Sequence, residues 1–75
     1  MYIEGNKETA MRFYCVRITK PDGHWIDYCA DHQNAKEARK ATIKTAGQKD
    51  GIEHGTAQIM SINATVFNRG KVVTF

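Results

Sequence analysis

The chain has 75 residues and a formal net charge of +3, with 41% hydrophobic and 25% charged residues. These proportions are typical of a folded globular protein and exclude an intrinsically disordered chain. The length suits one small domain with a thin core. The sequence contains no run of about 18 apolar residues, which excludes a membrane-spanning helix of ordinary length.

Residues 1–10 (MYIEGNKETA) are polar, and we interpret them as a flexible N-terminal arm before a single domain over residues 11–75. The arm lacks the basic segment and the apolar segment that together make a signal peptide. We therefore expect a cytoplasmic protein without a membrane partner.

Two strands are expected at residues 12–20 and 25–30, because both segments are rich in β-branched and aromatic residues. The residues between them place Pro21 where φ is about −65° and Gly23 where φ is positive, as in a type I turn followed by a glycine bulge. Pairing Lys20 with His24 across this turn sets the register of a hairpin. A slip of one residue would place Ile18 against Asp27, so the pattern favours this register.

The register gives the hairpin two different faces. The inner face is apolar apart from a phenol and consists of Tyr14, Val16, Ile18, Ile26 and Tyr28. The outer face pairs Arg17 with Asp27 and Cys15 with Cys29, and it also carries Phe13, Thr19 and Trp25.

A helix is expected over residues 35–46, with Gly47 as the residue that ends it. Asn34 followed by Glu37 resembles a capping box, and Asp31 is a competing cap. Small residues share one side of this helix, so that side can lie close to a sheet. The predicted core consists of Tyr14, Val16, Ile18, Ile26, Tyr28, Ala38, Thr42, Ile59 or Met60, and Ile62.

The rest of the chain reads as a loop over residues 48–55, a long extended segment over 56–68 and a final strand over 71–75. Asn68-Arg69-Gly70 predicts the last turn, and a turn at Asn63 is an alternative that the sequence does not exclude. The order is ββαββ. The predicted class is α+β, with an antiparallel sheet of three or four strands and one helix packed on one face.

Residues with catalytic or metal-binding chemistry form no recognisable pattern. Cys15 and Cys29 are compatible with a cross-strand disulfide, but a cytoplasmic location favours two reduced thiols. These cysteines with His32 and His54 lack the two closely spaced ligand pairs of a zinc site. Neither a glycine-rich phosphate loop nor a nucleophile near a base is present. We therefore expect no enzyme activity, metal or cofactor.

Two groups of residues suit binding to a partner. Lys36, Lys40 and Lys44 recur every four residues and form a stripe on the helix, with further basic residues nearby, although a solvated helix face has the same pattern. Large aromatics beside charges on the outer hairpin face resemble interface anchors, unless the arm or the C-terminal strands cover them. The predicted partner-binding residues are Phe13, Arg17, Trp25, Asp27, Lys36, Arg39, Lys40, Lys44 and Lys49.

The stretch FYCVRITKPDGHWIDYCADHQNAKEARKAT, about half the chain, resembles the arm-type, three-stranded DNA-binding domain of phage tyrosine recombinases. It departs from that domain by lacking the leading strand and by continuing into two more C-terminal strands. The whole element order, including His54-Gly55-Thr56 before the third strand, resembles small ββαββ phage proteins of the anti-CRISPR type, notably type I-F inhibitors. That resemblance implies a non-enzymatic protein that covers the nucleic-acid-binding surface of a complex in the host cytoplasm.

The expected function is therefore that of a small phage- or plasmid-type inhibitor or modulator that docks on a protein or nucleoprotein complex. One alternative is a DNA- or RNA-binding module that uses the basic helix and the sheet face. Another is an antitoxin-like partner protein. Either a monomer or a homodimer is compatible with the sequence, since a final strand at an exposed edge can pair with a second copy.

Overall fold

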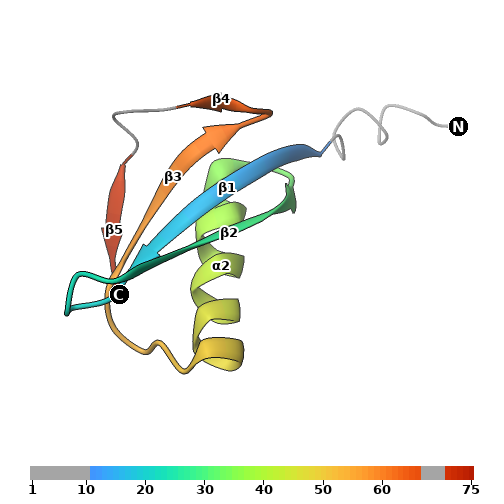
Figure 1. Ribbon diagram of the computed structural model, residues 1–75. Helices are drawn as coiled ribbons and strands as arrows, with labels where there is room; N and C mark the ends of the chain where they lie inside the picture. Colours follow the sequence, from blue (N-terminus) through green and yellow to red (C-terminus); the bar gives the residue numbers. More distant parts are fainter. Residues whose placement is uncertain (1–10, 67–70) are drawn as a thin grey trace, which may run out of the picture.

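The computed structural model describes residues 11–66 and 71–75, which form one antiparallel sheet with a helix on one face (Figure 1). The elements are β1 (Arg12–Thr19), β2 (Trp25–His32), α2 (Ala35–Asp50), β3 (Thr56–Ile62), β4 (Thr65–Val66) and β5 (Val72–Thr74). The strand order is β2-β1-β3-β4, and β5 also pairs with β3. The predicted α+β class and ββαββ order are confirmed. The arm proposed for residues 1–10 lies outside the described residues.

The β1–β2 hairpin has the predicted register throughout. Arg17 pairs with Asp27 and Cys15 with Cys29, and β2 extends two residues beyond its predicted end at Ala30. The turn is closed by the amide of Gly23, which donates to the carbonyl of Lys20 at 2.9 Å. Gly23 has a φ of 95°, the positive value that a glycine bulge needs.

Helix α2 begins as predicted and ends later than predicted. The side chain of Asn34 accepts a hydrogen bond from the amide of Glu37 at 2.9 Å, so Asn34 is the cap, and Asp31 belongs to β2. The prediction that Gly47 ends the helix is wrong. The helix continues to Asp50 and closes at Gly51, which has a φ of 67° and donates its amide to the carbonyl of Ala46.

The C-terminal half turns at Asn63, the alternative that the sequence left open. Asn63 and Ala64 both have positive φ, as a two-residue hairpin turn requires, and this turn adds the short strand β4. The turn predicted at Asn68 lies outside the described residues. The last strand pairs within the chain, because Val73 lies opposite Ala57 on β3.

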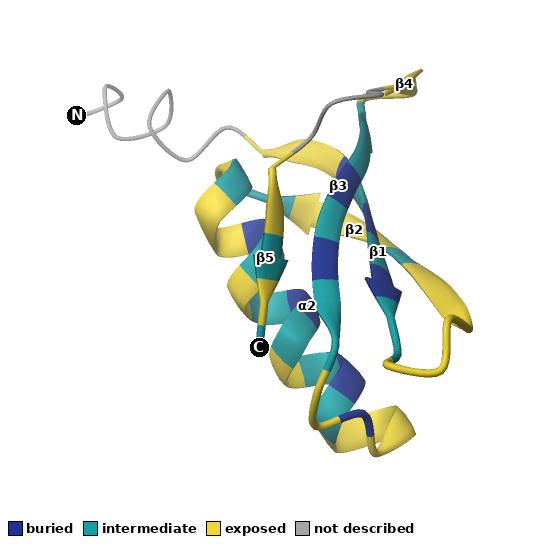
Figure 2. Ribbon diagram, turned by 90° about the vertical axis from the view of Figure 1, so that its left-hand side faces the viewer, coloured by how far each residue is buried: buried dark blue, intermediate teal, exposed yellow. Residues whose placement is uncertain are grey.

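The core lies between α2 and the inner face of the sheet (Figure 2). The buried residues are Tyr14, Val16, Ile18, Ala38, Thr42, Ala46, Ile52, Ala57 and Ile59. A bulge in β3 decides between two candidates, because Val16 pairs with Ile59 and Cys15 with Ser61, which leaves Met60 as the extra residue.

Three residues predicted for the core are more accessible than expected. Ile26 is 38% exposed, because it lies near the turn on the edge strand β2. Tyr28 and Ile62 are half-buried at the margin of the core.

Candidate partner-binding surfaces

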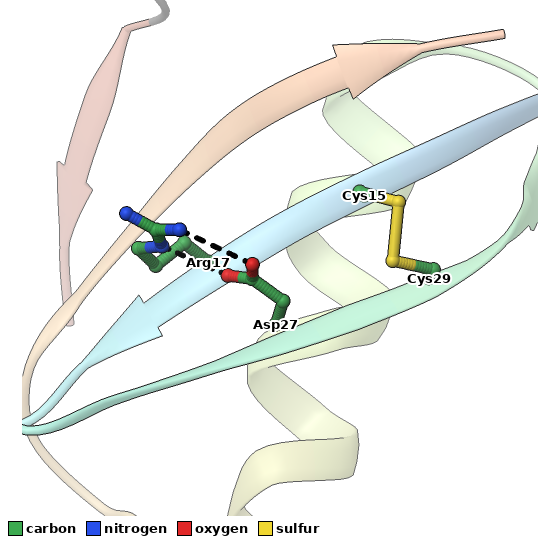
Figure 3. Close-up of a disulfide and its surroundings, with 4 residues drawn as sticks. All are labelled: Cys15, Arg17, Asp27 and Cys29. Atoms are coloured by element: carbon green, nitrogen blue, oxygen red, sulfur yellow. Dashed lines mark hydrogen bonds and ion pairs between the residues drawn. A yellow bond between two sulfur atoms is a disulfide. The ribbon is translucent and has the colours of Figure 1, made fainter. Parts of the chain in front are cut away.

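The face of the sheet opposite α2 carries the aromatic and charged residues predicted for binding. We call Phe13, Arg17, Trp25 and Asp27 the open sheet face. Figure 3 shows the Arg17–Asp27 pair on this side of the strands, with the helix behind them. β4 and β5 lie in the sheet and pair with β3, so they do not cover this face. Phe13 is 46% exposed and Trp25 is 52% exposed.

Arg17 is held in place by two neighbours on β2. Its Nε lies 2.9 Å from Oδ1 of Asp27, and its Nη2 donates to Oδ2 at 3.2 Å. The centre of its guanidinium lies 3.7 Å from the centre of the Trp25 ring, a cation–π contact. The hydrogen bond that Arg17 donates to Asp27 raises the pKa of Arg17, while desolvation opposes that shift. The arrangement therefore places an ion pair and an aromatic ring side by side on the open sheet face.

The cysteine pair lies on the same face and forms a disulfide. Figure 3 shows Cys15 joined to Cys29, next to the Arg17–Asp27 pair. The expectation of two reduced thiols is therefore wrong for this structure. The hairpin register brings the two Cα atoms to 4.1 Å, which places the sulfur atoms within reach of each other. Both cysteines are used, so neither is available as a thiolate ligand for zinc.

The histidines proposed with them lie in two different grooves. His32 lines a groove between β2 and α2, and His54 lines another groove beside Pro21 at the hairpin turn. Within residues 11–66 and 71–75, no group of three or more His, Cys, Asp or Glu side chains is placed to hold a metal ion.

The predicted basic residues of α2 divide into three positions. Lys36, Arg39 and Lys40 line a groove between the helix and β5. Lys44 is exposed outside this groove, and Lys49 lines the groove on the β2 side of the helix. The three lysines of the predicted stripe are all exposed on the helix, and two of them, Lys36 and Lys40, also line the groove between the helix and β5.

Sequence reasoning missed one member of the groove between α2 and β5. Lys71 lies just before β5 and lines this groove with the helix residues. No spacing rule links Lys71 to Lys36, because only the pairing of β5 with β3 brings the two together. The alternation of side-chain directions along the strand KVVTF was the one available hint. It places Lys71 on the same side of the strand as Val73, the side that faces the helix.

Tyr28 lines the groove between β2 and α2, which has a volume of about 300 Å³. Its hydroxyl donates a hydrogen bond to Asp50, the last residue of the helix. Burial raises the pKa of Tyr28 to about 12, and the hydrogen bond to Asp50 adds to the shift. The contact therefore links the edge strand β2 to the last turn of the helix.

The helix that the structure describes is too short and too polar to cross a membrane. Comparison with known protein families, with curated proteins and with solved structures found no match to this chain.

Proposed function

We propose that this chain is a small non-enzymatic binding protein that docks on a protein or nucleoprotein complex through the open sheet face. The observation that carries the proposal is Arg17, fixed between the carboxylate of Asp27 and the ring of Trp25. Aromatic and arginine side chains dominate the energy of protein interfaces. A fixed arginine also loses little conformational freedom on binding, which raises affinity.

The mode of action proposed is obstruction. The open sheet face belongs to the sheet, so it is presented by a rigid element rather than by a loop. A partner seated on Trp25 and Phe13 would have its own surface covered by this domain. Small ββαββ phage inhibitors of the anti-CRISPR type, which the element order resembles, act in this way on surfaces that bind nucleic acid.

The test is affinity capture from a bacterial lysate with the full chain as bait, followed by reconstitution of each captured complex from purified components. The matched variants are Trp25→Ala on the open sheet face and Lys44→Ala on the opposite, helix side. We expect a partner that survives nuclease treatment, keeps its affinity for Lys44→Ala and loses about tenfold or more with Trp25→Ala. Equal affinity for both variants would refute the proposed surface.

The second candidate is a module that binds single-stranded nucleic acid. It is favoured by the exposed rings of Phe13 and Trp25, which lie towards opposite ends of the same hairpin face, since bases stack on aromatic side chains. In that case nuclease removes the captured partner, and affinity for an oligonucleotide falls steeply with salt. Retention of the partner after nuclease treatment excludes this candidate.

A cytoplasmic site of action would expose the disulfide to cellular reductants. Capture with and without reductant therefore belongs to the same experiment. We expect the partner to be retained in both, because Arg17, Asp27 and Trp25 are positioned by the strand register and by each other. Loss of the partner on reduction would restrict the function to an oxidising compartment.

A further inference from the structure

A second surface, separate from the open sheet face, lies on the other side of the sheet. It is the groove between α2 and β5, with a volume of about 410 Å³, and we call it the basic groove. Figure 1 shows β5 at the edge of the sheet next to β3, and side chains from β5 and α2 line the groove together. Its lining residues are Lys36, Arg39, Lys40, Ile43, Lys71 and Val73.

Four of these six residues are cations, and none of the six is acidic. Across residues 11–66 and 71–75, no carboxylate lies within ion-pair distance of any of the four. Like charges gathered without counter-charges repel one another, and an anionic occupant would remove that repulsion. Lys36, Lys40 and Lys71 are exposed and Arg39 is half-buried, so all four can reach a ligand.

The floor of the basic groove is aliphatic. Ile43 and Val73 are both half-buried and line the groove together with the cations. The lining contains no aromatic ring on which a nucleic-acid base would stack. An aliphatic floor between cations instead matches a peptide in which carboxylates flank a branched apolar side chain.

Strand β5 also favours an extended occupant. Among the described strands it pairs with β3 alone, so its other edge keeps unpaired backbone groups. A peptide that adds to a sheet edge gains backbone hydrogen bonds, while alternate side chains enter the neighbouring groove.

We propose that the basic groove takes an extended acidic segment of a partner protein, with an aliphatic side chain seated on Ile43 and Val73. Carboxylates on either side of that side chain pair with Arg39, Lys40 and Lys71. Arg39 supplies the planar, two-pronged donor that a carboxylate prefers. This inference does not rest on the open sheet face, and either surface can fail its test alone.

The test is fluorescence anisotropy with a short labelled peptide of Asp and Glu around a central Leu. The groove variant is Lys40→Glu with Lys71→Glu, and the control is Lys44→Glu with Lys49→Glu. Both double variants change the net charge equally, but only the first alters the basic groove. We expect the groove variant to lose about tenfold or more in affinity and the control to lose about twofold or less.

A second variant tests the aliphatic floor. Val73→Thr keeps the branched shape and suits a strand, so we expect it to fold. It should weaken the Leu peptide about fourfold and leave a peptide with Ser in place of Leu unchanged. On the wild-type chain, amide NMR shifts caused by the Leu peptide should include Ile43 and Val73.

Three results would overturn the inference. One is an equal loss of peptide affinity in the two double variants. Another is tighter binding of a thymidine oligonucleotide than of the Leu peptide at the same salt concentration, which would identify a nucleic-acid site. The third is the absence of NMR shifts at Ile43 and Val73 when the Leu peptide is added to the wild-type chain.

Discussion

At the scale of single residues, the clearest titration behaviour belongs to Tyr28. Its pKa lies at about 12, above the ordinary value of 10.0, because burial and the bond to Asp50 favour the neutral phenol. A pKa raised on folding contributes stability that is complete below pH 10 and is lost as the pH rises towards 12. The wild-type chain should therefore lose stability over this window through Tyr28.

The variant Tyr28→Phe removes this titration. We expect its free energy of unfolding to fall less between pH 9 and pH 11 than that of the wild type, as measured by urea denaturation. Other groups titrate equally in both chains, so the difference reports Tyr28 alone. Parallel pH profiles would contradict the assignment.

Gly55 illustrates a different constraint, which is the close approach of two backbones. A Cβ atom at this position would lie 2.2 Å from the carbonyl oxygen of Thr19, and φ is 152°. Gly55→Ala should destabilise the domain by more than about 1 kcal/mol, since the backbone of β1 must move. Gly51→Ala is the control, because its φ is also positive but its Cβ meets nothing within 4 Å. Thermal denaturation should give a lower midpoint for Gly55→Ala than for Gly51→Ala.

At the scale of elements, the β1–β2 hairpin is closed twice, by its turn and by the disulfide between residues 14 positions apart. A loop of about 15 residues closed by a disulfide is stabilised by about 3 kcal/mol in the chain-entropy description. We expect Cys15→Ala with Cys29→Ala to lower the free energy of unfolding by about 2–3 kcal/mol.

The measurement is urea denaturation of the double variant and of the wild type, each with and without reductant. Reductant should lower the stability of the wild type and leave the double variant unchanged. A wild-type chain that is insensitive to reductant would show that the bond contributes nothing in solution.

The register of the hairpin could be predicted from the sequence, whereas the end of the helix could not. The hairpin register was predictable because Pro21 and Gly23 define a turn type, and a turn type fixes every pair that follows. The helix end was not, because Gly47 and Gly51 are both plausible terminators. The choice depends on Ile52, which is buried against the core and draws the chain back after Gly51. That is a tertiary contact, which no local pattern contains.

At the scale of the whole molecule, the core and the two candidate surfaces are energetically separable. Trp25 is about half exposed, whereas Ile18 is fully buried between the sheet and α2. We expect Trp25→Ala to cost less than about 1 kcal/mol and Ile18→Ala about 3 kcal/mol, a large share of the stability of a small domain. Chemical denaturation of both variants checks this. If Trp25→Ala costs as much as Ile18→Ala, loss of binding in that variant would reflect unfolding.

The candidate sites were only partly predictable for a related reason. The open sheet face was found because the register alone places Arg17 opposite Asp27 and diagonal to Trp25. The basic groove was only half found, because Lys71 reaches it through a strand pairing between distant segments. Local patterns determine what one hairpin or helix presents, and topology determines what two elements present together.

β4 and β5 both pair with the same edge of β3, and this limits how two copies of the sheet can associate. Strands of two and three residues occupy that edge, so the only long free edge of the described sheet is the eight-residue β2. Two copies that meet along β2 in antiparallel fashion present the same surface to each other, and such a contact is closed after one pairing. Antiparallel association along β2 would therefore close as a two-fold dimer and leave no β2 edge for a third copy.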